Sequence, residues 1–342
     1  MQQRKIRVVQ LGLGAIGVDI ARLIAQQGGM ELVGAIERDE SKIGAALAEI
    51  IQSPIPAGIH VRSDAHAVLR QTRPDVVVIS TTSYLHEVFP QIRACVEAHA
   101  HVVSTCEELV FPYAEEPEVA QTLDGMAREA SVAVLGTGIN PGFAMDLLPI
   151  LLTAPSSDVR HISVTRVVNA GTRRWTLQQR IGAGIERSAF RDWARQRGTP
   201  HVGLRQSIHM IAAALGWTLE QVVEGMEPIL ADTWVRTPYV SVAAGQVAGI
   251  HQWAHGIVDG RQRLRLDWRT AVGIEETYDA VQIDGTPPID MVIRGGIHGD
   301  LATATLVMRA VPSVVAARPG LRTVLDLPIL HYHAATRQEN RA

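Results

Sequence analysis

The chain has 342 residues, of which 46% are hydrophobic and 20% charged, and its formal net charge is −3. This length leaves room for two domains with a large core. The charge balance gives no basic footprint for nucleic acid, and the longest apolar runs have strand length, too short to span a membrane. The chain starts without a charged-then-apolar signal segment. We therefore expect a cytoplasmic protein that binds neither nucleic acid nor a membrane.

The rare residue types narrow the chemistry further. The two cysteines, Cys95 and Cys106, fit neither a disulfide framework nor a metal site, which is typical of a reducing compartment. Only two of the 32 basic residues are lysines, Lys5 and Lys42. A catalytic lysine, as acid, base or Schiff-base former, is therefore not expected. Four histidines lie on different elements without a carboxylate at ligand spacing, so we predict no metal site. These histidines are His251, His255, His331 and His333.

A glycine loop stands between a predicted strand over residues 6–11 and helical apolar spacing over residues 18–27. Strand, glycine loop and helix in this order are typical of dinucleotide-binding folds. Gly12 permits the tight turn, Gly14 lets the backbone approach a pyrophosphate, and Gly17 allows the helix to pack closely on the strand. The sequence therefore predicts a nucleotide cofactor at this loop.

The surroundings of the loop predict which dinucleotide binds. Ala15 and Ile16 begin the helix, whose N-terminus offers unpaired N–H groups and a positive dipole end to phosphates. A second strand ends in Glu37 and Arg38. Glu37 has the position of the acidic residue that binds the ribose 2′-hydroxyl of NAD, and Arg38 could pair with the 2′-phosphate of NADP. Arg38 is equally consistent with a solvated loop residue, so we expect NAD, NADP or both.

Strands and helices alternate through the first 140 residues, which predicts an α/β fold with a Rossmann-type doubly wound parallel sheet. Thr81 and Thr82 end one strand, where their hydroxyls would meet the cofactor. The next strand delivers Cys106, Glu107 and Glu108 to the edge where such sheets bind ligands. The predicted helices cover 65–71, 89–99 and 118–130, and the further strands cover 31–36, 75–80, 101–105 and 132–136.

Turn-forming residues at 136–142 mark a crossing into a second domain. We predict a dinucleotide-binding domain over 1–140, with a C-terminal helix over 301–330 packing back on it. A second α+β domain for substrate binding and dimerisation is expected over 141–300, built on a mainly antiparallel sheet. Its predicted helices are 143–152, 188–198 and 207–215, and its strands are 161–169, 241–248, 252–258, 263–271 and 291–294; a last helix covers 302–315 and a loose tail 334–342.

Four motifs occur together in one order, and jointly they carry a resemblance. They are the glycine loop, Ser-Thr-Cys-Glu-Glu at 104–108, Gly-Thr-Gly-Ile-Asn-Pro-Gly at 136–142, and His-Gly-Asp at 298–300. This combination resembles the 2,4-diaminopentanoate dehydrogenase family, including the related native amine dehydrogenases, and more distantly dihydrodipicolinate reductase. The resemblance spans residue 6 to about residue 328. It implies NAD(P)-dependent oxidative deamination of an amine, reversible as reductive amination of a ketone or aldehyde with ammonia, in a homodimer built through the second domain.

The resemblance also implies a catalytic glutamate, which maps onto Glu107 or Glu108. In the wider family of sugar-oxidising dehydrogenases, a lysine serves the chemistry at the position that Glu108 occupies here, which argues against alcohol oxidation by that mechanism. A carboxylate can accept and return the protons of amination, and in its ionised form it stabilises an iminium cation. We expect Glu108 to be the proton carrier, with Glu107 as the alternative.

The candidate substrate residues all have a structural alternative. Phe143 and Met145 would be pocket walls, although helix-spaced apolar residues are usually core. Arg166 and Asn169 could line the pocket, or Arg166 could be an ordinary surface or interface arginine. His298 could orient the substrate, but it could also be a capping or core histidine. The expected substrate is a small aliphatic amine or the side-chain amine of an amino acid.

Two further functions stay open at this point. A dihydrodipicolinate-reductase-like enzyme would reduce a cyclic imine, but it favours a basic run with several histidines and lysines, and the second domain has no lysine. A non-catalytic NAD(P)-binding redox sensor would bind the cofactor without turnover.

Overall fold

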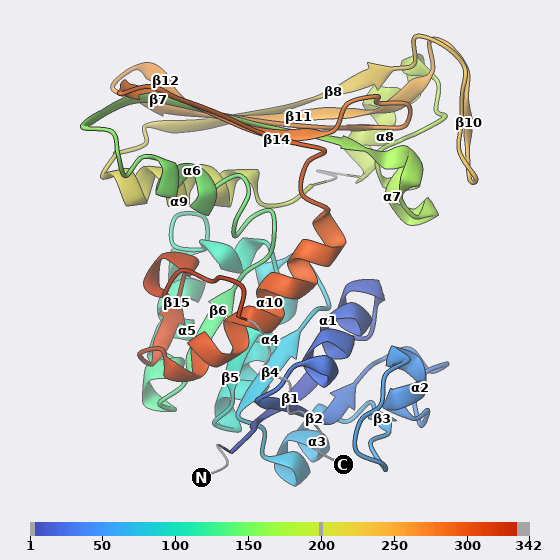
Figure 1. Ribbon diagram of the computed structural model, residues 1–342, viewed down its shortest axis with the longest axis vertical. Helices are drawn as coiled ribbons and strands as arrows, with labels where there is room; N and C mark the ends of the chain where they lie inside the picture. Colours follow the sequence, from blue (N-terminus) through green and yellow to red (C-terminus); the bar gives the residue numbers. More distant parts are fainter. Residues whose placement is uncertain (1–3, 198–200, 334–342) are drawn as a thin grey trace, which may run out of the picture. The chain divides into compact units, whose positions relative to one another are not determined.

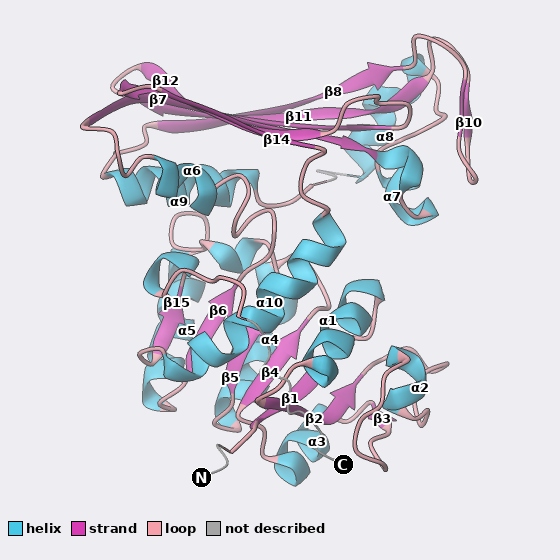
Figure 2. Cartoon of the chain, in the orientation of Figure 1, coloured by secondary structure: helices cyan, strands magenta, loops and turns pink. Residues whose placement is uncertain are grey.

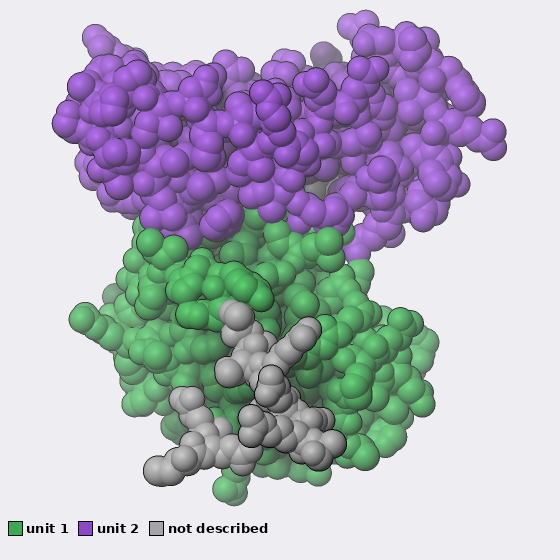
Figure 3. Space-filling model, in the orientation of Figure 1, with its two compact units in different colours: residues 1–142, 299–342 green, residues 143–298 purple. Residues whose placement is uncertain are grey.

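The computed structural model describes residues 4–197 and 201–333. The predicted tail over 334–342 and the last residue of the predicted helix over 188–198 lie outside the described residues. Two compact units make up the chain: unit 1 contains residues 1–142 and 299–342, and unit 2 contains residues 143–298 (Figure 3). In the described part of the chain, no helix combines the length and the apolar character that a membrane span requires.

Unit 1 is built on a seven-stranded parallel sheet in the order β15-β6-β5-β4-β1-β2-β3 (Figure 2). This confirms the predicted doubly wound fold. The strand order reverses between β1 and β4, so the carboxyl ends of these strands frame the switch point at which such sheets bind ligands. The strands are β1 (Ile6–Leu11), β2 (Met30–Ile36), β3 (Val61–Arg62), β4 (Val76–Ile79), β5 (His101–Ser104), β6 (Ala133–Gly136) and β15 (Gly320–Arg322).

Helices cover both faces of this sheet. On one face α1 and α10 pack against each other, and α10 also contacts β4, β5 and β6 (Figure 1). On the other face α3, α4 and α5 bury a core that includes Val102, while the next residue, Val103, is equally buried and points to the opposite face. Burial on both faces explains why these strands are continuously apolar. The helices are α1 (Ala15–Gln26), α2 (Leu47–Ile51), α3 (Ala65–Thr72), α4 (Leu85–Glu97), α5 (Pro117–Glu129) and α10 (Gly299–Ala316).

Unit 2 is built on a six-stranded sheet in the order β14-β13-β7-β12-β11-β8, in which only the β7–β12 pair is parallel. The prediction of a mainly antiparallel sheet is therefore confirmed. The strands are β7 (Asp158–Asn169), β8 (Gln221–Leu230), β11 (Val247–Val258), β12 (Arg261–Ala271), β13 (Tyr278–Thr286) and β14 (Ile289–Arg294), and β9 (Val235–Arg236) pairs separately with β10 (Ser241–Val242).

The helices of unit 2 lie on one side of this sheet (Figure 1). Helix α9 contacts β11, β12 and α6. Along β11, Ile250 and Ala254 are fully buried, whereas His251, Trp253 and His255 alternate with them and are partly exposed. The sheet therefore has one covered and one open face. The helices are α6 (Leu147–Leu152), α7 (Trp175–Arg180), α8 (Phe190–Arg197) and α9 (Leu204–Leu215).

Some of the predicted elements of unit 2 are wrong in extent. The strand predicted over 241–248 is interrupted by a turn at 243–246, and β11 begins only at Val247. The helix predicted over 143–152 begins at Leu147, because the buried Asp146 precedes it as the N-cap and accepts a hydrogen bond from the Leu147 backbone N–H at 2.6 Å. The other Asp146 oxygen accepts a hydrogen bond from the Ser207 hydroxyl of α9 at 2.8 Å, so the cap is also a tertiary contact.

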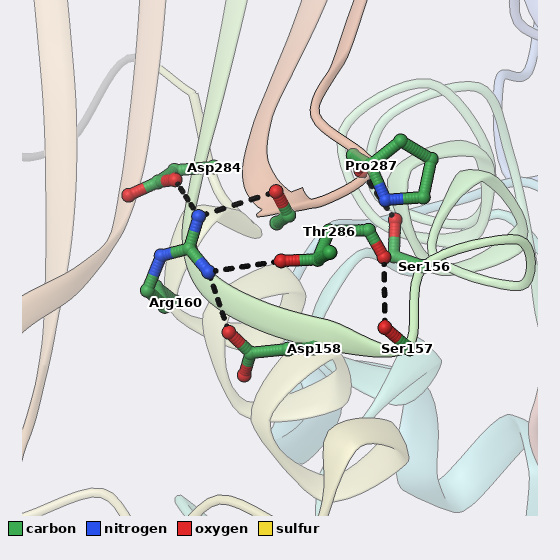
Figure 4. A network of polar contacts seen from close by, with 8 residues as sticks. Ser156, Ser157, Asp158, Arg160, Asp284, Thr286 and Pro287 are labelled. Carbon is green, nitrogen blue, oxygen red and sulfur yellow. Dashed lines mark hydrogen bonds and ion pairs between the residues drawn. The ribbon is translucent and has the colours of Figure 1, made fainter.

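Arg160 ties the ends of β7 and β13 together (Figure 4). Its guanidinium lies 2.5 Å from the carboxylates of both Asp158 and Asp284, and it donates to the Thr286 hydroxyl at 3.3 Å. Exposed ion pairs of this kind contribute little stability each. The contacts lie where the pairing register of β7 and β13 shifts, between Asp284 and Gly285. The network therefore helps to hold the two strands in this register.

Candidate active site

A cavity of about 800 Å³ opens at the carboxyl ends of β1, β2 and β4 in unit 1. Its position matches the switch point of the sheet. The predicted cofactor residues that line it are Gly12, Gly14, Glu37, Arg38, Thr81 and Thr82. The lining residues that sequence reasoning missed are Leu11, Ile36, Asp39, Lys42, Ser63, Ala65, Ser80, Glu87 and Gln91.

The glycine loop meets the geometric demands of a dinucleotide. Gly12 has φ +90°, a conformation that side chains rarely adopt, and a Cβ on Gly17 would lie 2.0 Å from the Gly12 carbonyl oxygen. Gly14 differs, because its φ is −66° and a Cβ there would meet no atom within 4 Å. The protein itself therefore does not require glycine at this position, whereas the close approach of a pyrophosphate does. Ala15 and Ile16 form the first turn of α1, which begins directly after Gly14, and the first N–H groups of a helix have no partner within the helix.

The carboxylate of Glu37 is held at the edge of the cavity. One oxygen accepts a hydrogen bond from the Leu13 N–H at 2.6 Å, and the other accepts from the N–H groups of Arg38 at 2.7 Å and Asp39 at 3.2 Å. Partial burial opposes the charged form, but these three hydrogen bonds and the charge of Lys42 outweigh it and lower the pKa of Glu37. Glu37 is therefore an ionised hydrogen-bond acceptor at the edge of the cavity.

The cations beside Glu37 differ in their surroundings. Lys42 pairs with Asp39 at 2.9 Å, while Arg38 is exposed and lines the cavity. On the β4 side, the Thr81 hydroxyl donates to Gln91 of α4 at 2.8 Å and the Thr82 hydroxyl donates to Glu87. These hydroxyl oxygens keep lone pairs that can accept from a bound ligand.

The two glutamates follow β5, the neighbour of β4 in the sheet. Glu108 is half-buried; its carboxylate accepts a hydrogen bond from the Leu85 N–H at 2.6 Å, and its own N–H donates to the Ser83 carbonyl at 3.2 Å. Since Leu85 is the first residue of α4, Glu108 satisfies one of the free N–H groups at that helix N-terminus. Glu107 is also half-buried. The strand end thus holds one carboxylate in a fixed position and a second beside it.

Cys106 has a different environment from the one expected for a cofactor ligand. Its side chain is fully buried and its thiol contacts the Ser83 carbonyl oxygen at 3.2 Å. Burial raises the pKa of the Cys106 thiol. The side chain is therefore an inert part of the core, and only the main chain of Cys106 is left to meet a cofactor.

Arg166 in unit 2 is committed to a buried contact. It is 3% exposed, and its guanidinium lies 2.7 Å from the Asp279 carboxylate and donates to the Ile297 carbonyl at 2.6 Å. Asp279 in turn accepts from the Ile297 N–H at 2.7 Å. The Arg166–Asp279 pair therefore binds both the carbonyl and the N–H of Ile297, the residue that immediately precedes His298.

His298 itself is exposed and lies beside an arginine that sequence reasoning missed. The Arg173 guanidinium donates to the imidazole of His298 at 2.8 Å. Arg173 follows the short 3-10 turn (Ala170–Thr172) at the end of β7, and no motif distinguishes it from the many other arginines. The structure thus brings Arg166, Arg173 and His298 into one region of unit 2. Arg166 makes a buried structural contact, whereas Arg173 and His298 are bonded to each other nearer the surface.

The other candidates in unit 2 have structural contacts. Asn169 donates to the Ile274 carbonyl at 2.7 Å and accepts from the Gly171 N–H at 2.7 Å, so it caps a turn. Met145 is fully buried, and Phe143 is half-buried at the start of the unit. The side chains of Asn169 and Met145 therefore stabilise unit 2 itself.

The parallel sheet, the glycine loop and Glu37 define an NAD(P)-binding oxidoreductase of the Rossmann class. In agreement, residues 6–137 match the oxidoreductase family with an NAD-binding Rossmann fold. Residues 143–341 match the 2,4-diaminopentanoate dehydrogenase C-terminal domain. The chain belongs to the 2,4-diaminopentanoate dehydrogenase family.

Individual relatives agree with this assignment. The chain is 36% identical to the 2,4-diaminopentanoate dehydrogenase of Acetoanaerobium sticklandii over 333 residues, which cover 95% of this chain and 94% of that protein. It is 24% identical to an amine dehydrogenase of Streptomyces virginiae over 95% of this chain and 96% of that protein. The structure of an amine dehydrogenase from Mycobacterium smegmatis superposes with a TM-score of 0.84 at 27% identity, covering 96% of this chain and 97% of that one. The protein is therefore an NAD(P)-binding dehydrogenase of the amine dehydrogenase kind, as the motifs predicted.

Proposed function

We propose that the protein catalyses the reversible oxidative deamination of a primary amine, with Glu108 as the proton carrier. In the oxidative direction the protonated amine, NAD(P)⁺ and water give a ketone or aldehyde, ammonium, NAD(P)H and a proton. The observation that carries the proposal is the position of Glu107 and Glu108. They follow β5, directly beside the end of β4, whose Ser80, Thr81 and Thr82 line the cavity of an NAD(P)-binding unit.

The residues of unit 1 divide the work. The glycine loop and Glu37 hold the cofactor, which when bound accepts the hydride from the carbon that carries nitrogen. Glu108 takes a proton from the substrate ammonium before hydride transfer and releases it to solvent. It then takes a proton from the water that adds to the iminium carbon and returns it to the nitrogen of the carbinolamine. The nitrogen leaves as ammonia, which takes up the proton of the carbinolamine hydroxyl as the carbonyl forms and departs as ammonium. The charge of Glu108 also stabilises the iminium cation. The hydrogen bond from Leu85 N–H keeps one carboxylate oxygen in place, so the other is the oxygen that exchanges protons.

The substrate class is the finer part of the proposal. We take the substrate to be an amino acid that carries a second amine, because the relative at 36% identity is named for 2,4-diaminopentanoate. Such a substrate has a carboxylate, and a guanidinium recognises carboxylates with paired hydrogen bonds. We therefore expect amines that carry a carboxylate to be preferred over simple aliphatic amines.

Steady-state kinetics test this function. NADH or NADPH formation is followed with 2,4-diaminopentanoate, ornithine, simple aliphatic amines and alcohols, and cofactor consumption is followed with the matching ketones and ammonia. We expect turnover with amines and lower KM values for the amines that carry a carboxylate. We expect no turnover with alcohols. The absence of turnover across the whole amine panel would refute the proposal.

We further propose a homodimer formed through the open face of the unit 2 sheet. His251, Trp253 and His255 of β11 lie on that face, and a partly exposed tryptophan in a broad sheet is typical of an interface. Sedimentation velocity should give a dimer for the wild type and a monomer for Trp253→Glu. A wild-type monomer at micromolar concentration would contradict the assignment.

A further inference from the structure

Gln10 is a polar residue in the interior of β1. It lies between Val9 and Leu11, and its side chain is fully buried. An amide in such a place costs free energy unless it is hydrogen-bonded. Its Nε2 atom donates to the Gly12 carbonyl at 2.9 Å and to the Ser80 hydroxyl at 2.9 Å. Gln10 therefore reaches forward along its own strand to the first glycine of the loop.

Ser80 completes this contact from β4. Its hydroxyl accepts from Gln10 and donates to the same Gly12 carbonyl at 3.0 Å. The carbonyl oxygen lies beneath the first turn of α1, since a Cβ on Gly17 would be 2.0 Å from it. The Gln10 and Ser80 side chains therefore both donate to this carbonyl.

The other end of the same peptide group is also held. The carbonyl of Gly12 and the N–H of Leu13 belong to one peptide plane, and that N–H donates to the Glu37 carboxylate at 2.6 Å. Gln10 and Ser80 therefore hydrogen-bond to the carbonyl of the Gly12–Leu13 peptide, and Glu37 hydrogen-bonds to its N–H. A peptide next to glycine is otherwise among the freest in a chain, because no Cβ restricts its rotation.

The geometry points to Gln10 and Ser80 as positioning residues for cofactor binding: they fix the Gly12–Leu13 peptide, and through its N–H they fix the carboxylate of Glu37. The amide is needed as a donor, because its own carbonyl oxygen has no hydrogen-bond partner in the described part of the chain. A carboxylate or an apolar side chain of the same length would lose both donated bonds. This inference rests on NAD(P) binding and is independent of the amine chemistry.

Calorimetric titration with NADH and NADPH tests the inference without turnover. Gln10→Met keeps the length of the side chain and removes its donors. We expect the Kd for NADH to rise roughly tenfold, the size of one lost buried hydrogen bond. Because Glu37 loses its fixed position, the ratio of the NADPH Kd to the NADH Kd should fall. In the Glu37→Gln background the same Gln10→Met change should move that ratio less than about twofold, since the coupled group is absent.

A matched control separates positioning from loss of stability. Val8 is fully buried in the same strand, and Val8→Ala should lower thermal stability while leaving both Kd values within about twofold of wild type. If Gln10→Met does not fold, Ser80→Ala removes the second donor from outside β1 and should change both Kd values in the same direction, more weakly. In an active enzyme, Gln10→Met should raise the KM for the cofactor and leave kcat and the amine KM near wild type.

Two outcomes would overturn the inference. One is wild-type cofactor affinity in both Gln10→Met and Ser80→Ala. The other is an equal loss of affinity in Val8→Ala at equal loss of stability, which would mean that the amide acts only through the fold. Neither outcome depends on the substrate, so a failure of the amine assay leaves this test intact.

Discussion

The carboxylate of Glu37 accepts a hydrogen bond from the backbone N–H of Leu13 at 2.6 Å, across 24 residues of sequence. The contact joins the end of β2 to the loop after β1. The carboxylate that we propose for the adenosine ribose and the loop that we propose for the phosphates are therefore joined by a hydrogen bond. A substitution at Glu37 should therefore alter the position of the loop, and a substitution in the loop should alter the position of the Glu37 carboxylate.

Replacing Glu37 should alter the choice between the two cofactors. An ionised carboxylate at the adenosine ribose repels the 2′-phosphate of NADP and accepts hydrogen bonds from the ribose of NAD, and we propose this role for Glu37. In Glu37→Gln the repulsion disappears, while exposed Arg38 remains. We expect the NADP-to-NAD ratio of kcat/KM to rise roughly tenfold or more, which corresponds to about 1.4 kcal/mol. An unchanged ratio would show that Glu37 does not face the ribose, and Arg38→Ala should lower the ratio again.

The two glycines that bracket the start of α1 should respond to alanine in different ways. A Cβ at Gly14 meets nothing in the protein within 4 Å, so Gly14→Ala should keep the thermal stability near wild type and weaken NADH binding. A Cβ at Gly17 meets the Gly12 carbonyl oxygen at 2.0 Å, so Gly17→Ala should lower the free energy of unfolding by about 1–3 kcal/mol or more. Urea unfolding and calorimetry on both variants check this. Equal stability losses would contradict the assigned roles.

Replacements of Glu108 should separate its charge from its contact with α4. Glu108→Gln keeps an oxygen that can accept from the Leu85 N–H, so stability should change little, while kcat falls by about 10²–10⁴-fold. Glu108→Ala should lose the same activity and, because the helix N-terminus is then uncapped, about 1 kcal/mol of stability as well. Cofactor affinity should stay near wild type in both. Glu107→Gln should retain most activity; the reverse pattern would make Glu107 the proton carrier.

Asp267 should make the stability of unit 2 depend on acid pH. Burial opposes its charge, but hydrogen bonds from His251 at 2.6 Å and Arg265 at 2.5 Å outweigh that effect and lower the pKa of Asp267 to about 2, from 3.8. The unfolded chain therefore binds a proton before the folded one does. The contribution, roughly 2 kcal/mol, is complete above about pH 4 and is lost as the pH falls toward 2.

Asp267→Asn supplies the measurement for this prediction. Denaturant unfolding of wild type and variant between pH 2 and pH 6 should show a gap in unfolding free energy that is largest above pH 4 and narrows toward pH 2. A gap that stays constant across this range would show that the carboxylate does not titrate with the expected shift.

Some elements escaped prediction because their residues contradict local rules. Strand β8 contains Gly225 and Pro228, which are turn signals in sequence. It is an edge strand, where a proline does not break a ladder on both sides, and a Cβ at Gly225 would lie 2.3 Å from the Trp253 ring. Strand β13 has Asp279 at a buried position, which hides the apolar alternation; its charge is neutralised by Arg166.

Helix α4 illustrates the same limit at a helix start. The sequence placed its beginning at residue 89, yet the helix starts at Leu85 and continues through Pro90. The group that satisfies its first N–H is the carboxylate of Glu108, 23 residues away. A cap supplied from a different strand end leaves no pattern in the helix sequence itself.

The sequence by itself determined the parallel sheet, the glycine loop, the position of Glu37 and the strand that ends in Glu107 and Glu108. Periodicity and short-range spacing suffice there, because each feature depends on neighbours along the chain. Only the tertiary structure decided the remaining contacts. Gln10 and Ser80 both donate to one carbonyl of the glycine loop. Arg166 is buried against Asp279 and the Ile297 carbonyl, and Arg173 donates to His298. Those roles arise where distant strand ends converge, and a hydrogen bond across such a junction depends on distance in space, which spacing in sequence does not encode.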